Sequence, residues 1–220
     1  MSSPSERDMR NLIVKACQGL FQRGLIAATD GNVSARVSAT RVLITPSYVS
    51  KGEVTAASLL LCDMDGKVVK GCGKASAEVQ VHLAAYKARE DVRGVVHAHP
   101  PIATAFTFAG QESIFRDPIV PEIIGQIGPI PTAPYLTPGS QALADAVFPL
   151  VKECEIVLMA QHGAVTTGKD PWAAYLRMEK LEQLAGILRS AGELAGGLDN
   201  IKRLTAEQAA DVLRSYGKKT

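Results

Sequence analysis

The apolar positions of the chain follow two periods, which together predict a mixture of helices and strands. Within residues 6–23 they recur every three or four positions, the spacing of one helix face, at Met9, Leu12, Ile13, Ala16 and Leu20. Within residues 33–37 apolar and polar residues alternate instead, as in a half-buried strand. Along the whole chain these patterns predict helices over about 6–23, 77–88, 101–109, 140–152 and 171–190 with a last one from 205, and strands over 33–37, 41–45, 59–62, 67–69, 94–98 and 155–159.

Capping residues mark where several of these helices should begin. Ser76 and Ser140 each precede a predicted helix, where a serine side chain can accept a hydrogen bond from a free backbone N–H. Asp170 is followed by a proline, which is typical of a cap and first turn. Thr205 has a glutamine three residues later, as in a capping box. We therefore expect helices to start at these four points.

Turn residues complete the predicted architecture. Asp65-Gly66 separates two short strands, as in a hairpin, and the stretch 117–138, rich in proline and glycine, is expected to hold short strands and loops. Helices interleaved with strands predict an α/β fold with a mixed sheet covered on both faces. Because no repeat and no long linker divides the 220 residues, we expect a single domain over residues 1–220.

Composition and charge exclude several classes of protein. The chain is 46% hydrophobic and 21% charged, as in globular proteins, and its formal net charge of +2 gives no electrostatic case for binding nucleic acid or an anionic membrane. It has no apolar run long enough for a membrane span, and its polar start is unlike a signal peptide. Four cysteines without a Cys-x-x-Cys pair indicate reduced thiols, so we expect a cytoplasmic protein.

Three of the four histidines form a pattern typical of a metal site. In the predicted strand ending Val-Val-His-Ala-His-Pro, His97 and His99 should point the same way. Two neutral imidazoles at that spacing can bind one metal ion. His162 follows an apolar strand, in a loop that can reach the same edge of the sheet. Three histidines with open positions are the protein ligands of a catalytic zinc, so we expect a metal site at these residues.

Two further polar residues, Glu78 and His82, lie four positions apart on the predicted helix 77–88. Glu78 falls in the first turn, and a carboxylate beside a dication can serve as the base that moves protons on the substrate. The alternative for Glu78 is a surface residue that only favours the helix N-terminus. For His82 we prefer a local hydrogen bond on the helix over metal ligation.

Three turns combine small hydrogen-bond donors with backbone amides: Gly31-Asn32, Thr45-Pro46-Ser47 and Lys74-Ala75-Ser76. The last of them also opens a predicted helix, where free N–H groups favour phosphate. Such turns usually serve only the backbone, so each is a weak indication alone. Together they make an anion pocket a hypothesis.

The motifs together resemble the class II aldolase/adducin family, and within it the L-fuculose-1-phosphate aldolase-like enzymes. The resemblance runs over nearly the whole chain, through TDGNVSAR at 29–36, ITPS at 44–47, KASAE at 74–78, VHAH at 96–99, QHG at 161–163 and YG at 216–217. It implies a three-layer α/β/α fold with a central mixed, largely antiparallel sheet. It also implies a homotetramer with sites at subunit interfaces.

The resemblance further implies roles for individual residues. Zinc would be held by the three histidines, with Glu78 as the catalytic acid/base; related ribulose-phosphate 4-epimerases typically carry aspartate there, so the glutamate favours an aldolase. The family's contacts with the substrate phosphate correspond to Asn32, Ser47 and Ser76. Tyr216 is a candidate proton donor that would reach a neighbouring subunit's site, and covering hydrophobic surface is its alternative role.

Three positions depart from the family pattern. Ala77 replaces the second serine of a Ser-Ser-Glu phosphate motif, which removes one hydroxyl donor. Ser47-Tyr48 stands where the family has Thr-Gly, so a ring replaces hydrogen where the backbone should approach the phosphate closely. Glu122 lies near the place where the fuculose-phosphate enzymes have an acidic tyrosine. These departures weaken the assignment of one particular reaction.

The reaction implied is reversible aldol cleavage of a phosphorylated ketose, of the fuculose-1-phosphate type, to dihydroxyacetone phosphate and an aldehyde through a zinc-stabilised enediolate. A metal-dependent decarboxylase or a methylthioribulose-phosphate dehydratase of the same fold is the alternative. A non-catalytic adducin-like module is least favoured, because such a module would be expected to lack the metal histidines. The identity of the sugar phosphate stays open, as does the choice of zinc over manganese or cobalt.

Overall fold

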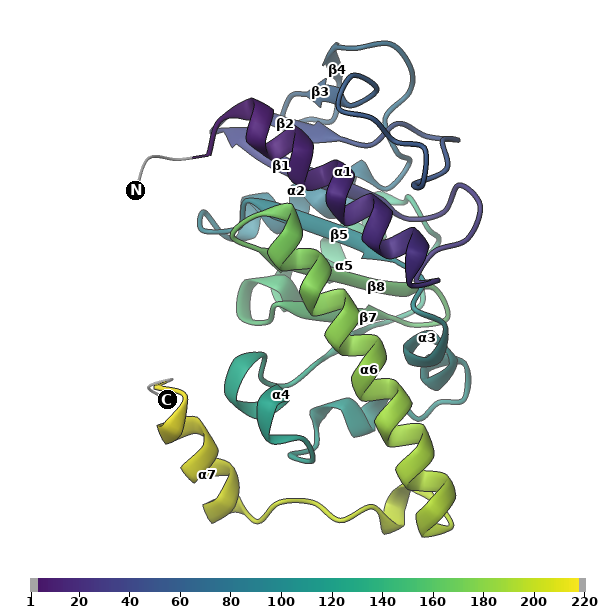
Figure 1. The fold of residues 1–220 in the computed structure, drawn as a ribbon, viewed down its shortest axis with the longest axis vertical. Helices are drawn as coiled ribbons and strands as arrows, with labels where there is room; N and C mark the ends of the chain where they lie inside the picture. The colour runs from purple at the N-terminus through teal and green to yellow at the C-terminus, as the bar shows by residue number, and fades with distance from the viewer. Residues whose placement is uncertain (1–3, 218–220) are drawn as a thin grey trace.

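The computed structural model describes residues 4–217 and contains an eight-stranded sheet with helices on both faces (Figure 1). The strand order is β4-β3-β2-β1-β5-β8-β7-β6, and each neighbouring pair is antiparallel except β6 with β7. The strands are β1 (Asn32–Ser38), β2 (Arg41–Ile44), β3 (Leu60–Cys62), β4 (Val68–Lys70), β5 (Gly94–Ala98), β6 (Thr132–Ala133), β7 (Ile156–Met159) and β8 (Gly163–Gly168). The helices are α1 (Glu6–Gln22), α2 (Val79–Ala88), α3 (Pro101–Phe108), α4 (Pro121–Gln126), α5 (Gln141–Glu153), α6 (Pro171–Ala195) and α7 (Ala206–Ser215), with short 3-10 turns at Glu112–Arg116 and Leu198–Asn200.

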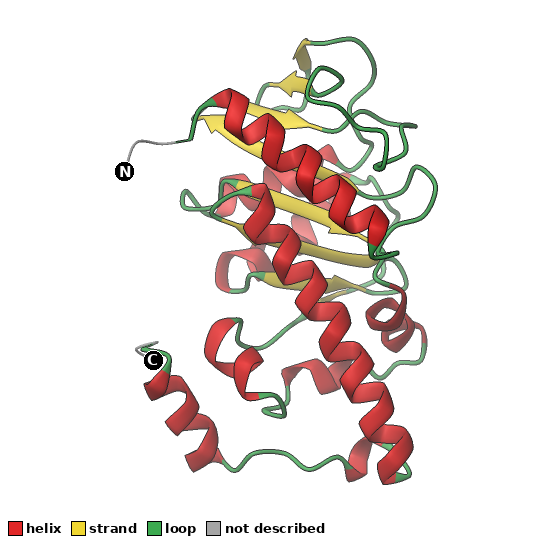
Figure 2. Ribbon diagram, in the orientation of Figure 1, coloured by secondary structure: helices red, strands yellow, loops and turns green. Residues whose placement is uncertain are grey.

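Two pairs of helices cover the two faces of the sheet, which confirms the predicted three-layer fold. Helices α1 and α6 lie on one face and α2 and α5 on the other (Figures 1 and 2). The apolar stripe of α1 buries Met9, Ile13 and Leu20 in a cluster shared with α6 and the sheet. On the opposite face, Leu83 of α2 and Val147 of α5 belong to a second buried cluster. The sheet therefore separates two apolar layers, as expected when helices bury one stripe each.

Helix α2 starts two residues later than the sequence predicts. This helix begins at Val79, and Glu78 rather than Ser76 takes the N-cap position. Ala75 pairs with Pro46 in an isolated bridge, Ser47 N–H donates to the carbonyl of Lys74 at 2.9 Å, and residues 76–79 form a turn in which Val79 N–H donates to the carbonyl of Ser76 at 3.1 Å. This turn stands in place of the first helical turn that the sequence predicts.

Two other segments also differ from the prediction. The stretch 117–138 contains helix α4, opened by Pro121 in its first turn, and β6 is the only strand that it contributes. Strand β8 was not predicted, because Gly163–Gly168 reads Gly-Ala-Val-Thr-Thr-Gly and shows no apolar alternation. Its threonines are nevertheless buried between β5 and β7, where strand pairing satisfies their backbone.

The predicted starts of the last two helices are confirmed, and the predicted end of α6 is too early. Asp170 caps α6 by accepting from the N–H of Ala173, and α6 continues beyond the expected end near 190 to Gly196, whose φ of 72° is typical of a C-terminal stop. Thr205 caps α7 in a capping box. Among residues 4–217, no helix combines the length and apolarity that a bilayer span needs.

The register between β1 and β5 determines which side chains lie close together on the α2 side of the sheet. Strands β1 and β5 are antiparallel neighbours with Asn32 opposite His97. Since side chains alternate between the faces of a strand, Asn32, Ser34 and His97 face the α2 side, while Val33 and Val96 enter the apolar layer under α1 and α6. The polar residues of these strands are thereby gathered at the N-terminal end of α2.

Candidate metal centre and active site

The structure brings together the three histidines that the sequence predicts as metal ligands. His97 lies in β5, His99 follows that strand, and His162 lies in the turn between β7 and β8. One ring nitrogen of each histidine lies within 4.8 Å of a ring nitrogen of the other two. The Nε2 atoms of His97 and His99 are 3.1 Å apart. Three imidazoles from separate parts of the sheet edge therefore converge on one point.

The turn that carries His162 is fixed by contacts with its surroundings. Gln161 adopts a φ of 54°, in the left-handed region, and its N–H donates to the hydroxyl of Thr107 on α3 at 3.0 Å. Gly163 packs so closely on β5 that an added Cβ would lie 2.4 Å from the carbonyl oxygen of Ala98. This position accepts only glycine without a shift of the strand, so it helps to hold His162 in place.

Glu78 faces the histidines from the N-cap of α2. Its Oε2 lies 2.9 Å from Nε2 of His97, and its Oε1 lies 3.1 Å from Nε2 of His162. Burial alone would raise the pKa of Glu78, but His97 and His162 hold it well below its usual range. An ionised carboxylate in contact with two candidate ligands is in the right position to transfer a substrate proton.

The chemistry of this donor set fits a divalent cation. The carbonyl of Ala164 lies 2.9 Å from Nδ1 of His97, which leaves Nε2 of that ring to face the cluster. Burial, followed by the neighbouring His97 and His162, lowers the pKa of His99 to about 4 and keeps it neutral, as a ligand must be. Burial alone would lower the pKa of His97, but the Glu78 carboxylate raises it, so the cluster attracts positive charge. A metal ion meets that requirement with the nitrogen and oxygen donors that it prefers.

The three turns proposed as an anion pocket also lie together. Asn32 Nδ2 donates to the hydroxyl of Ser76 at 2.8 Å, and the hydroxyl of Ser47 donates to the carbonyl of Ala75 at 2.8 Å. Tyr48, the residue after Ser47, adopts a φ of 61°, and its side chain is exposed. The turns at 31–32, 46–47 and 74–76 thus form one surface next to Glu78. Phosphate binding by Asn32, Ser47 and Ser76 stays a prediction.

The sequence interpretation missed the buried residues behind this surface. His82 is completely buried and contacts Asn32 Oδ1 and the Ser34 hydroxyl on β1, instead of making a bond along its own helix. The interpretation also missed Asp30, which is exposed and places a carboxylate oxygen 3.7 Å from Nδ1 of His99. The small polar residues that alternate along β1, opposite a helix histidine, were the signal that could have revealed the first of these contacts.

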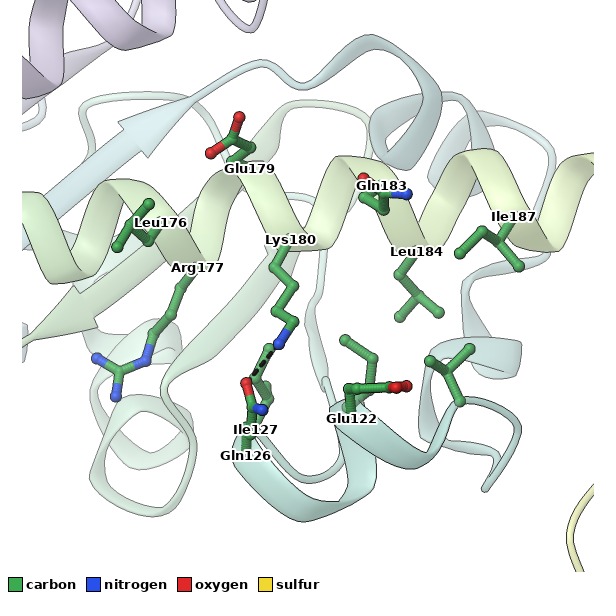
Figure 3. A pocket seen from close by; sticks show the side chains of 12 residues that line it. Glu122, Gln126, Ile127, Leu176, Arg177, Glu179, Lys180, Gln183, Leu184 and Ile187 are labelled. Atoms are coloured by element: carbon green, nitrogen blue, oxygen red, sulfur yellow. Dashed lines mark hydrogen bonds between the residues drawn. The ribbon is translucent and has the colours of Figure 1, made fainter.

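Tyr216, the candidate proton donor, and Glu122, near the place of the family's acidic tyrosine, lie elsewhere in the chain. Tyr216 follows α7, and its ring packs on α4, where a Cβ added to Gly125 would lie 2.3 Å from it. Glu122 lines a cavity of about 730 Å³ between α4 and α6 (Figure 3). Within the part of one chain that the structure describes, neither residue is in the group of side chains that surround the three histidines.

Comparison with known proteins identifies the family. A family model described as the class II aldolase and adducin N-terminal domain matches residues 11–188. The chain belongs to the class II aldolase and adducin family. Enzymes of this family include both aldolases and decarboxylases, so lyase chemistry is the shared expectation for its members.

Relatives of two activities match the chain. A 3-oxo-tetronate 4-phosphate decarboxylase from Pectobacterium atrosepticum is 31% identical over 215 residues, covering 96% of this chain and 95% of its own length. An L-fuculose phosphate aldolase from Methanococcus maripaludis is 31% identical over 172 residues, covering 78% of this chain and 91% of its own. The crystal structure of YgbL from Klebsiella pneumoniae, for which aldolase, epimerase and decarboxylase are given as alternatives, superposes with a TM-score of 0.86 at 29% identity, covering 95% of this chain and 99% of its own.

Proposed function

We propose that the protein is a metal-dependent lyase that breaks a carbon–carbon bond beside a carbonyl group in a phosphorylated sugar, with aldol cleavage of a phosphorylated ketose as the principal reaction. The observation that carries this proposal is the position of Glu78, whose two oxygens lie 2.9 and 3.1 Å from His97 and His162. A base in contact with candidate ligands can act on a substrate that binds at the same point. Cleavage of this kind would yield dihydroxyacetone phosphate and an aldehyde.

His97, His99 and His162 would hold the metal, and zinc is the ion that we propose because three histidines with open positions are its usual catalytic set. When bound there, a divalent cation supplies Lewis-acid stabilisation of the negative charge that develops on the substrate's oxygens. Manganese and cobalt are alternatives that a histidine-rich site also accepts.

Glu78 would carry the proton to or from the carbon next to the carbonyl group. Its lowered pKa keeps it ionised before the transfer, and Asn32 Nδ2 donates to its Oε2 at 3.1 Å, which fixes the carboxylate. Asn32, Ser47 and Ser76 would hold the phosphate of the substrate on the adjoining surface. A substrate anchored at that end presents its carbonyl to the histidines in a fixed orientation.

Aldol cleavage requires a second group that exchanges a proton with the aldehyde oxygen. Tyr216, which packs on Gly125 of α4, is our principal candidate. Glu122 is the other, and it lies on the same helix, facing the cavity between α4 and α6 (Figure 3). We propose that the protein is a homotetramer in which Tyr216 completes the site of a neighbouring subunit. The site would then lie at a subunit interface.

Decarboxylation is a second candidate, supported by the decarboxylase relatives that match 94–96% of this chain. Loss of carbon dioxide from a 3-oxo-tetronate 4-phosphate leaves dihydroxyacetone phosphate, the same three-carbon product that aldol cleavage releases. Only one proton must then be delivered, to carbon, and the Glu78 carboxylate could pass it on after taking it up from water. The two reactions therefore share the half of the site that lies within one chain.

Product analysis separates these candidates. Zinc-loaded protein would be incubated with a panel of ketose 1-phosphates and, separately, with 3-oxo-tetronate 4-phosphate, while dihydroxyacetone phosphate, aldehyde and carbon dioxide are measured. We expect dihydroxyacetone phosphate with an equal amount of aldehyde, and no release by Glu78→Gln. Carbon dioxide without aldehyde would replace the aldolase by the decarboxylase. No product from either set would contradict the proposed function.

A further inference from the structure

A chain of buried hydrogen bonds runs from the core to Glu78. The hydroxyls of Tyr86 and Ser34 are 2.7 Å apart, and Ser34 Oγ is 2.6 Å from Nδ1 of His82. His82 Nε2 contacts Oδ1 of Asn32. Asn32 Nδ2 then reaches Glu78 Oε2 at 3.1 Å, and also the hydroxyl of Ser76. Of these residues, the proposed function uses only Asn32, Ser76 and Glu78.

The inner members of the chain are shielded from water. Ser34 and His82 are completely buried, Tyr86 is 2% exposed and Asn32 is 3% exposed. Polar groups at such positions must satisfy one another, because an unpaired donor or acceptor in the interior is costly. The direction of every bond in the chain therefore matters.

The direction follows from the carboxylate end. Asn32 turns its NH₂ group toward Glu78 Oε2 and Ser76 Oγ and its carbonyl oxygen toward His82, so the amide donates on the Glu78 side and accepts on the His82 side. That oxygen needs a donor, which places the ring proton of His82 on Nε2. Burial keeps His82 neutral by lowering its pKa to about 3, so Nδ1 is an acceptor and the Ser34 hydroxyl must donate to it. Tyr86 in turn donates to Ser34.

We propose that His82 and Ser34 are positioning residues that fix the amide of Asn32 as a donor toward Glu78 and, with the N–H that now contacts Ser76, toward the substrate phosphate. With the proton on Nδ1, His82 would present a lone pair to Asn32, and the amide would turn over. Its carbonyl oxygen would then face the Glu78 carboxylate and the phosphate, both of them anionic. The tautomer of one buried histidine thus determines whether the site favours or repels its substrate. The kinetic part of this inference rests on the proposed function.

The first test reads the tautomer without any turnover. Nitrogen-15 NMR of the imidazole rings in zinc-loaded protein distinguishes a proton on Nε2 from one on Nδ1, and His82→Gln identifies the His82 signals among the four histidines. We expect His82 to be neutral with its proton on Nε2. A proton on Nδ1, or a charged ring, would overturn the inference whether or not the protein cleaves any substrate.

The second test compares Ser34→Ala with Tyr86→Phe as its matched control. Each variant removes one buried hydroxyl, but only Ser34→Ala removes the donor to Nδ1 of His82. We expect Ser34→Ala to populate the other tautomer and to lower kcat by roughly 10–100-fold with zinc still bound, the range found for residues that orient a site from behind. Tyr86→Phe should keep the Nε2 tautomer and a kcat within about twofold of the original. An equal loss of kcat in both variants, or no loss in Ser34→Ala, would show that these buried hydrogen bonds have only a structural role.

Discussion

The two parts of the proposed active site differ in how completely one chain builds them. The histidines and Glu78 lie at the edge of the sheet, and Glu78 is in direct contact with His97 and His162. Helix α7, which carries Tyr216 at its end, has no buried residue and packs on α4, away from the sheet (Figure 1). The residues proposed for metal binding and proton transfer at carbon are therefore assembled within one chain. In the proposed tetramer, the second proton donor comes from another subunit.

This difference separates two chemical steps that can be measured independently. In the proposed mechanism, exchange of the proton on dihydroxyacetone phosphate requires only the histidines and Glu78. Cleavage of an aldol substrate requires a group for the aldehyde oxygen as well. We call the histidines with Glu78 the sheet-edge half of the site, and α7 with Tyr216 the α7 half. Substitutions in the sheet-edge half should abolish both reactions, and substitutions in the α7 half should affect cleavage alone.

The largest effect is expected from His97→Ala. Loss of one of three ligands should leave less than stoichiometric zinc and lower kcat/KM by roughly 10³-fold or more, because a bound cation contributes several kcal/mol to charge stabilisation. Zinc per chain, measured by elemental analysis, and kcat/KM on the active ketose phosphate check this. His97→Ala protein that keeps one zinc per chain with full activity would show that the metal site lies elsewhere.

Glu78→Gln should have the next largest effect and, unlike His97→Ala, should keep the metal. The amide has nearly the same shape but cannot carry the proton, so we expect kcat to fall by roughly 10²–10⁴-fold. Zinc content and the thermal unfolding midpoint serve as controls for an intact site. A kcat that falls only in proportion to lost zinc would make Glu78 a structural residue.

Tyr216→Phe should lower aldol cleavage by roughly 10²-fold and leave proton exchange unchanged. Mixing this variant with Glu78→Gln under conditions that exchange subunits gives a sharper result. If the tyrosine acts on its neighbour, some mixed sites contain both native residues, and cleavage activity should rise above that of either variant alone. The absence of such a rise, with subunit exchange verified by mass spectrometry, would argue against a site completed across subunits.

The smallest effect is expected from Gly125→Ala. The new methyl group would meet the Tyr216 ring, 2.3 Å from its Cδ2 atom, so the ring and α7 must shift. Since α7 buries no residue fully, the free energy of unfolding should change by less than about 1 kcal/mol. Cleavage activity should fall while the rate of proton exchange stays constant. Urea unfolding measures the free energy, and the two activity assays measure cleavage and exchange. Loss of proton exchange in this variant would contradict the separation of the two halves.

The sequence allowed most of the sheet-edge half to be predicted, because its signals are local. The His-x-His pair needs only a strand to bring its rings together, and His162 needs only to follow the neighbouring apolar strand. The contacts of His82 with Asn32 and Ser34 were missed, since the alternating small polar residues of β1 indicate a polar strand face but not that His82 of α2 lies against it. Strand β8 was missed because pairing on both sides, and not an apolar pattern, makes Gly163–Gly168 a strand.

The α7 half was the least predictable part. Its capping box at Thr205 is a local signal and was recognised, but where the helix packs depends on α4, a helix that the proline- and glycine-rich sequence did not suggest. The place of Tyr216 relative to a complete active site depends further on the arrangement of subunits. Neither is encoded in a short pattern.

The most direct test of the central claim is proton exchange on dihydroxyacetone phosphate in D₂O, followed by proton NMR. Zinc-loaded protein should replace one of the two hydrogens on the hydroxymethyl carbon with deuterium, since a single base removes the proton from one side. Exchange should be abolished in Glu78→Gln and in His97→Ala and preserved in Tyr216→Phe. Zinc-loaded protein that leaves both hydrogens in place, or Glu78→Gln that exchanges at the original rate, would contradict the account.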